Sequence, residues 1–338
     1  MRHGILLSSL MIVLPVTVPA QTTVAELVSG VRSALQQHKL DSEVARLVAG
    51  YKLAEQLPDA VVEQLKSEGA GPDTMSRFDW QQTITAGLPR PATLPVLFDA
   101  PPAPTDDQQK TIIEKAREWA LQFSSGLPDF IATETVSRSS AKKNSQFWAP
   151  QDTLTMSVAF SQKTRERYKL LTINGKPTKK DLSEAGGFTS YGEFGTGLQF
   201  LFDPASKTQF LWDRWTMLDG RPTYVFSYKV DLAHSTYTLT LLNKRIRSAM
   251  KGYVYLDRDS LQAMRLTAEA DGFPPEWGEM KTLTVVDYAY AEVAGERHLL
   301  PRRTYSRLMQ GAVRQRNVTE FSDYRKFSAE TTVSFGKE

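Results

Sequence analysis

The first eighty residues place apolar side chains at helical spacing. Apolar positions recur every three or four residues in the first such run, namely Val24, Leu27, Val28, Val31 and Leu35. This is the period of a helix that buries one face. Two more helices are expected, one after Asp41, a candidate N-cap, and one starting near Pro58-Asp59. Because helices this short are marginal alone, they are expected to pack as a small module over residues 21–86.

A proline-rich stretch and then a longer helical pattern follow. Residues 87–105, "GLPRPATLPVLFDAPPAPT", hold six of the eighteen prolines, which is typical of a semi-extended linker. Thr105 can cap a helix over 106–123, in which Ile112, Ile113 and Trp119 share one stripe. Because the proline-rich linker separates it from the rest of the chain, the helical module over residues 21–86 is predicted to be either a spacer or a docking module for an envelope protein. The helical pattern favours neither alternative.

From there the chain alternates apolar and polar residues with a period of two. We expect ten strands, at 153–161, 165–173, 208–218, 223–230, 235–242, 252–257, 261–270, 281–293, 298–309 and 314–327. Short turn signals separate several of them, so neighbouring strands should pair antiparallel. The predicted fold class of residues 106–338 is α+β, with one large curved antiparallel sheet. Helix 106–123 and a short helix near 196–202 are expected to cover it.

The N-terminal residues and the composition restrict the classes of function. A cation at Arg2, a short apolar stretch and the small residue Ala20 form the pattern of a cleaved signal peptide over 1–20, so we expect a periplasmic or secreted protein. There are no cysteines, which excludes disulfides and thiolate chemistry. The near balance of 41 Lys and Arg against 38 Asp and Glu gives no support to nucleic-acid binding.

The stretch "GGFTSYGEFGTGLQF" at 186–200 invites a comparison with phosphate-binding and catalytic loops. A dinucleotide fingerprint needs Gly where Phe200 stands, and a nucleophile elbow around Ser190 needs Gly where Phe188 stands. The pattern favours a tight loop entering a short helix, because glycine permits positive φ. A lid over a cavity and an anion site at the helix start are the alternatives. On the lid interpretation four glycines border the mouth of the cavity: Gly187, Gly192, Gly195 and Gly197.

No pattern of catalytic or metal-binding residues stands out. The histidines of the predicted mature chain, His38, His234 and His298, are far apart, and no zinc-hydrolase motif contains them. We therefore predict no catalytic residue, no metal site and no cofactor.

Aromatic residues alternate along four of the predicted strands. Nine of them are candidate ligand-binding residues: Phe210, Trp212, Tyr224, Phe226, Tyr228, Tyr253, Tyr255, Tyr288 and Tyr290. Since alternate residues of a strand point to one face, the four sets would form a broad aromatic surface if they share that face. Such a surface is either ordinary core or the lining of an apolar cavity.

Several longer strings carry a resemblance to known families. The strings "AREWALQFSSGLPDFIATETVSR", "LDGRPTYVFSYKV", "GYVYLDRDSLQAMRL" and "NVTEFSDYRKFSAETTVSF" resemble, over about residues 106–335, a family of uncharacterised secreted proteins common in Acidobacteria. Ala132 stands where members of that family often have Cys. The helix-plus-sheet order is also distantly similar to the half-barrel of periplasmic lipoprotein carriers of the LolA and LolB type.

The prediction for function combines these observations. We expect an exported, non-catalytic protein that binds an apolar or lipidic ligand, such as a lipid or a lipoprotein acyl chain. The alternative is a structural or protein-interaction envelope protein with a filled core, and a hydrolase of unknown substrate comes third. Function does not follow from fold alone.

Overall fold

The computed structural model describes residues 21–93 and 101–326, apart from 144, 146–147, 164, 189–192, 242–243, 272 and 274–279. The chain divides into two compact units, 1–97 and 98–338, each with its own hydrophobic core. The predicted signal peptide at 1–20 and the candidate Gly192 lie outside the described residues.

The first unit contains the helices α1 (Val24–Gln36), α2 (Asp41–Gly50), α3 (Asp59–Ser67) and α4 (Pro72–Thr85). The apolar positions that set the helical pattern are buried: Val24, Leu27, Val28 and Val31 are at most 2% exposed. Their burial confirms the helical period, and the structure adds α4, which the sequence analysis did not separate.

The expectation that Asp41 caps its own helix is wrong. Leu40 is the N-cap of α2, and the Asp41 carboxylate accepts hydrogen bonds from the backbone N–H of Asp73 at 2.7 Å and of Thr74 at 3.2 Å. Those donors belong to the first turn of α4, where the N-cap residue, Gly71, has no side chain to bind them. Asp41 therefore joins two helices of the unit.

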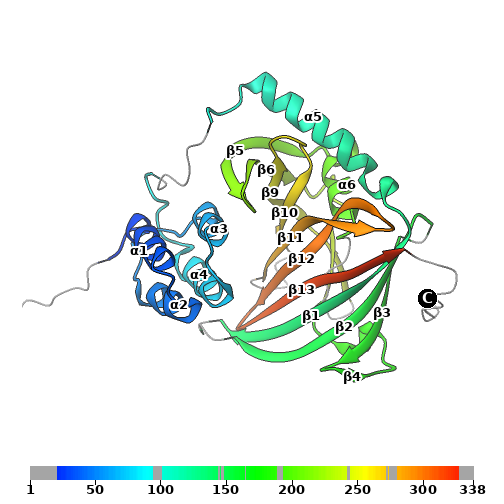
Figure 1. Ribbon diagram of the computed structural model, residues 1–338, viewed down its shortest axis with the longest axis horizontal. Helices are drawn as coiled ribbons and strands as arrows, with labels where there is room; N and C mark the ends of the chain where they lie inside the picture. The colour runs from blue at the N-terminus through cyan, green and yellow to red at the C-terminus, as the bar shows by residue number, and fades with distance from the viewer. Residues whose placement is uncertain are drawn as a thin grey trace, which may run out of the picture. The chain divides into compact units, whose positions relative to one another are not determined.

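The second unit has the helices α5 (Asp106–Phe123) and α6 (Thr196–Phe202) and the short 3-10 helices η1 (Ser124–Gly126), η2 (Leu182–Ala185) and η3 (Pro204–Ser206). Thr105 caps α5 as expected, since its Oγ1 accepts a hydrogen bond from the N–H of Gln108. Figure 1 shows α5 and α6 beside each other, and the Arg117 guanidinium of α5 donates to the carbonyl of Phe202 in α6 at 3.2 Å. No described helix is both long and apolar enough to cross a membrane.

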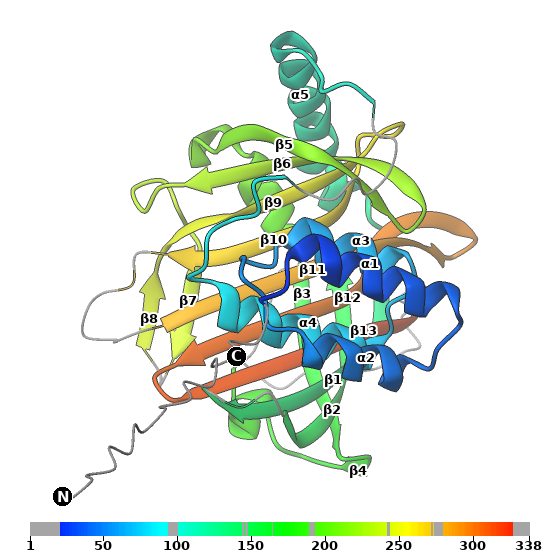
Figure 2. The ribbon, with the colours of Figure 1, turned by 90° about the vertical axis from the view of Figure 1, so that its left-hand side faces the viewer.

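The strands have the following bounds: β1 Phe130–Lys142, β2 Ala149–Ser161, β3 Arg165–Ile173, β4 Lys176–Pro177, β5 Gln209–Leu218, β6 Arg221–Val230, β7 Thr238–Leu241, β8 Lys244–Arg247, β9 Ala249–Asp257, β10 Ala263–Asp271, β11 Met280–Val293, β12 Glu296–Gln310 and β13 Val313–Lys326. Within the described residues, eleven of them form one antiparallel sheet in the order β4-β3-β2-β1-β13-β12-β11-β10-β9-β6-β5. Figure 2 shows most of this order, from β5 to β2. The sheet is curved and open, with α5 and α6 on its concave side (Figure 1), which confirms the predicted fold class.

Two features of the strands differ from the expectation. Residues 130–142 were not expected to be a strand, yet β1 lies inside the sheet between β2 and β13. The strand expected at 235–242 is shorter and, within the described residues, pairs with β8 in a separate two-stranded sheet.

The strand order of the large sheet has a consequence for its concave side. Because β4 and β5 are the two edges of the large sheet and follow each other in the chain, the connection at 178–208 must cross the sheet. We call residues 178–208 the crossing segment.

Candidate functional site

The crossing segment packs against the concave face of the sheet. Phe194, 1% exposed, lies 5.3 Å from the Phe130 ring of β1 and 5.4 Å from the Phe321 ring of β13, measured between ring centroids. On one side of this aromatic anchor the segment continues as α6. On the other side, residues 182–188 lie over β1, β2 and β13 as irregular chain and one 3-10 turn. We call residues 182–188 the cover.

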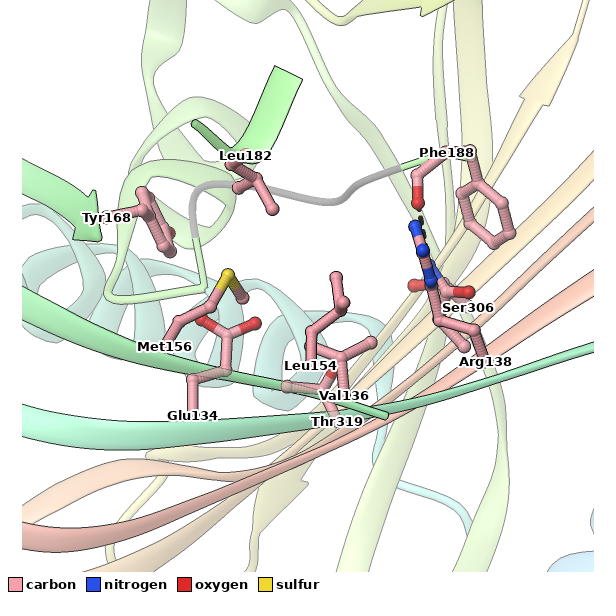
Figure 3. A pocket seen from close by; sticks show the side chains of 11 residues that line it. Glu134, Val136, Arg138, Leu154, Met156, Tyr168, Leu182, Phe188, Ser306 and Thr319 are labelled. Atoms are coloured by element: carbon pink, nitrogen blue, oxygen red, sulfur yellow. Dashed lines mark hydrogen bonds between the residues drawn. The ribbon is translucent and has the colours of Figure 1, made fainter. Parts of the chain in front are cut away.

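A small pocket lies between the cover and the sheet (Figure 3). The described side chains that line it are Glu134, Val136, Arg138, Leu154, Met156, Tyr168, Leu182, Phe188, Ser306, Asn317 and Thr319. They come from β1, β2, β3, β12, β13 and the cover. The enclosed space is about 20 Å³, which is enough for about one or two water molecules. As the structure stands, the pocket therefore has room for water but none for a chain-like ligand.

A row of polar side chains at one end of the pocket holds the cover in place. Asp152, Arg138 and Asn317 are direct partners on β2, β1 and β13, so they share the concave face. The Arg138 guanidinium donates to both oxygens of Asp152 at 2.6 Å, and it also donates to the backbone carbonyls of Gly186 at 2.5 Å and Ala185 at 3.0 Å.

The side-chain amide of Asn317 extends this row. It donates to the carbonyl of Phe188 at 2.7 Å, the dashed line in Figure 3. The cover is therefore bound through the carbonyls of Ala185, Gly186 and Phe188 to two side chains of the sheet. The Arg138 hydrogen bond lowers the pKa of the Asp152 carboxyl below its usual value, so this carboxyl stays ionised to lower pH.

Next to the polar row lies an apolar patch that is separate from the main core. Val136, Leu154, Met156 and Leu170 form a cluster of their own, each at most 5% exposed. Leu182 of the cover packs on it. The cover residues that pack on this patch, Leu182 and Ala185, belong to the single 3-10 turn η2.

Glu134 lies at the other end of the pocket. It is 5% exposed, and its Oε2 atom has no hydrogen-bond partner among the described residues. Figure 3 shows its carboxyl group on the pocket side of β1, next to Met156. Burial raises the pKa of Glu134 to about 9, with further contributions from the charges of Glu193 and Glu166.

The neighbouring carboxylates come from two other elements. Glu166 of β3 accepts hydrogen bonds from the Tyr168 hydroxyl at 2.5 Å and from the backbone N–H of Phe194 at 3.1 Å. Glu193, which precedes the anchor residue Phe194, is 6% exposed. Burial raises the pKa of Tyr168 well above its usual value, and the three carboxylates add to the effect. Among the described residues no set of three His, Asp or Glu side chains is placed to hold a metal ion.

The nine aromatic residues do not all share one face, so the condition for a single aromatic surface is not met. Phe226 and Tyr228 of β6 lie on the concave face, where the cross-strand partner of Phe226 is Val254 of β9. Tyr253 and Tyr255 flank Val254 and therefore point to the opposite, convex face. There the Arg214 guanidinium lies over both rings, 5.4 Å from the centroid of Tyr253 and 5.8 Å from that of Tyr255.

The aromatic residues on the concave face pack as core. Phe226 is 1% exposed and lies 5.5 Å from the Trp212 ring. The Tyr228 hydroxyl reaches across Gly252 and donates to the carbonyl of Thr267 at 2.6 Å. The others make contacts of the same kind: Phe210 with Phe202, Tyr224 with Trp215, Tyr288 with Phe123 and Tyr290 with Gln262. None of the nine candidates lines the pocket, so a ligand-binding role for them stays a prediction.

The described glycine candidates lie along the crossing segment. Gly195 has φ of +112° and is the N-cap of α6, which confirms the predicted loop entering a short helix; Gly197 is inside that helix. Gly187 has φ of +78°, and a Cβ atom there would lie 2.8 Å from the Arg138 Nη1 atom. Gly187 therefore adjoins a pocket-lining side chain directly.

The sequence analysis missed Glu134 and Arg138. Both occupy concave positions of β1, where the alternation of a half-buried strand calls for apolar residues. One signal in the sequence could have indicated them. Residues 130–142 contain Thr and Val, which are typical of strands, together with charged residues at two of the positions that face inward. Charged residues at positions that a pattern assigns to the core are themselves a sign of a site.

Comparisons with known proteins give structural likeness only. No family model and no curated protein matches the sequence, so the resemblance to the Acidobacterial family stays a prediction. The chain is similar to the solved structure of a LolA superfamily protein from Nitrosomonas europaea, at 14% identity and a TM-score of 0.29, covering 65% of this chain and 93% of that one.

Two further solved structures are similar to a comparable degree. A putative outer membrane lipoprotein-sorting protein domain from Vibrio parahaemolyticus is 14% identical with a TM-score of 0.31, covering 66% of this chain and 95% of that one. A DUF1329 family protein from Desulfovibrio piger is 10% identical with a TM-score of 0.31, covering 67% and 94%. Because these likenesses are distant, the functional proposal is based on the residues of this chain.

Proposed function

We propose that this protein is exported to the periplasm or beyond and binds the apolar chain of a lipid or lipoprotein beneath the cover, without catalysing a reaction. The observation that carries the proposal is the apolar patch of Val136, Leu154, Met156 and Leu170, which is separate from the core and covered by a short 3-10 turn, η2. A core that only had to be filled would gain most from a well-packed helix at that place.

The cover has the features of a part that can detach from the sheet. It is bound through carbonyl hydrogen bonds to Arg138 and Asn317, and each such bond contributes only about 1–3 kcal/mol net. Detachment would expose the apolar patch and enlarge a space of about 20 Å³. Binding of an apolar chain would then bury again the apolar surface that the detached cover leaves exposed to water.

A filled-core structural protein is the second candidate, and the small size of the pocket favours it. The two candidates differ in what happens to an apolar fluorescent probe. The proposal expects saturable probe binding by the mature chain and a co-purifying lipid in native mass spectrometry.

A matched pair of variants locates the binding site. Met156→Trp places a large side chain in the pocket and should abolish probe binding. Leu171→Trp makes the same kind of change at a side chain of β3 that is 37% exposed and does not line the pocket, and it should bind the probe like the parent. Absence of probe binding and of bound lipid in the parent, or equal binding by both variants, would contradict the proposal.

A further inference from the structure

The charges that face the pocket differ from those expected of a site for fatty acids or phosphate-bearing head groups. Of the described lining residues, Glu134 is the one carboxylic acid and Arg138 the one basic side chain. The guanidinium of Arg138 is already bound to Asp152 and to two carbonyls. The Glu134 carboxyl group at the other end of the pocket is not satisfied in this way, because its Oε2 atom has no hydrogen-bond partner among the described residues.

The surroundings of Glu134 add negative charge. Glu166 on β3 and Glu193 on the crossing segment both act on it electrostatically, and the Tyr168 hydroxyl is bound to Glu166. An anionic head group at this end would meet three carboxyl groups in a water-poor space, where repulsion is stronger than in bulk water. A cation with N–H donors would instead supply the hydrogen bond that Glu134 lacks.

We propose that the ligand beneath the cover is an alkyl or acyl chain with a primary amine at its polar end, bound through the unpartnered Glu134 carboxyl group. The inference rests on the proposed function. The chain would lie along Val136, Leu154 and Met156, which line the same pocket. The ammonium group would lie next to Glu134, at the end of the pocket away from Arg138. Glu134 and Arg138 are four residues apart on β1, which corresponds to about 13 Å along an extended strand.

Binding of the amine would release a proton. Because burial keeps the pKa of Glu134 at about 9, its carboxyl group is mostly protonated in the free protein at pH 7. The ammonium form enters with its charge, Glu134 gives its proton to the buffer, and a carboxylate–ammonium pair remains. Binding should therefore release about one proton per amine, and a neutral alcohol of the same length should release none.

The test uses the mature chain at pH 7 with dodecylamine, dodecanol and dodecanoate, each below its aggregation concentration. Affinities come from displacement of an apolar probe, and proton release comes from calorimetry in buffers of different ionisation enthalpy. We expect the amine to bind at least about tenfold more tightly than the alcohol, and the alcohol about tenfold more tightly than the acid.

Glu134→Gln keeps the shape of the side chain and removes the proton that it can release. It should bring the amine and the alcohol to within about threefold and abolish proton release. Glu292→Gln is the matched control, since Glu292 is an exposed residue of β11. If Glu134→Gln does not fold, two other measurements test the amine assignment. Glu166→Gln should weaken the preference for the amine, and the parent protein should still release a proton when it binds the amine.

The outcomes separate the two claims. Binding of dodecanol without a preference for the amine, or tighter binding of dodecanoate, overturns the amine assignment and leaves the apolar-chain site standing. An amine preference that survives in Glu134→Gln also overturns it. Binding of none of the three probes overturns the proposed function, and the amine assignment with it.

Discussion

The concave face of the sheet has an aromatic part on β5 and β6, called the aromatic half, and a mixed half on β1, β2 and β13. In the aromatic half, Phe226 is 1% exposed and the Tyr228 hydroxyl is bound to the carbonyl of Thr267. In the mixed half, Arg138 binds the cover and the Oε2 atom of Glu134 has no partner. Both halves are buried, and the carboxyl oxygen of Glu134 that has no partner among the described residues belongs to the mixed half.

The difference shows which buried surface is structural. Burial of a carboxyl group without a partner costs free energy that a well-packed apolar residue would not. A fold that needed only a core would repeat the aromatic half. The mixed half keeps a destabilising group, which points to a function there.

The largest expected effect is in the aromatic half. Phe226→Ala should lower the free energy of unfolding by about 3–5 kcal/mol, because a packed ring leaves a cavity behind. Probe affinity of the folded fraction should not change. The control is Leu211→Ala, since Leu211 is 69% exposed on β5, and chemical denaturation compares the two. A loss of probe binding in Phe226→Ala with little loss of stability would return the ligand site to the aromatic half.

In the mixed half, Glu134→Gln should stabilise the protein at alkaline pH. The pKa of Glu134 is about 9 in the folded chain against 4.5 for an ordinary Glu. The folded state thus holds the proton that the unfolded state loses, so stability falls as pH rises from about 4.5 to about 9, by up to about 1.4 kcal/mol per pH unit.

Denaturation at pH 6 and pH 8 measures this slope. In the parent the free energy of unfolding should fall by about 2 kcal/mol over that interval, and most of the fall should be absent in Glu134→Gln. Glu292→Gln should keep the parent's slope. Equal slopes in all three proteins would show that Glu134 is ionised in the folded chain.

A pair of glycine variants tests the attachment of the cover with a smaller effect. Gly187→Ala and Gly295→Ala both place a side chain at positive φ, +78° and +85°, and each should cost about 1–2 kcal/mol. Only the new Cβ atom at 187 meets Arg138, so only that variant should speed probe entry in stopped-flow fluorescence. Equal entry rates would show that the cover does not limit access.

The smallest effect concerns the helical unit. Each unit has its own hydrophobic core, so removal of residues 21–86 should leave the melting temperature and probe affinity of the remaining chain almost unchanged. A broad or strongly lowered melting transition of the truncated chain would show that the helical unit contributes to its core.

Strand β1 shows why part of the fold escaped the sequence analysis. The pattern at β6 is predictable because its concave positions, such as Phe226 and Tyr228, are apolar or aromatic. At β1 two of the concave positions are Glu134 and Arg138, which breaks the alternation that identifies a strand. The same residues that form the site therefore hid the strand that carries it.

The sequence by itself determined the local elements: the helical period of the first unit, the cap at Thr105, the turn into α6 and the alternation of most strands. These follow from spacing within a few residues, which a single chain displays. Only the tertiary structure decided which strands are neighbours. The pairing of β1 with β13 brings Arg138 next to Asn317, and the crossing segment brings Glu193 near Glu134. The raised pKa of Glu134 exists only in that arrangement, because burial and nearby charge are properties of the assembled sheet.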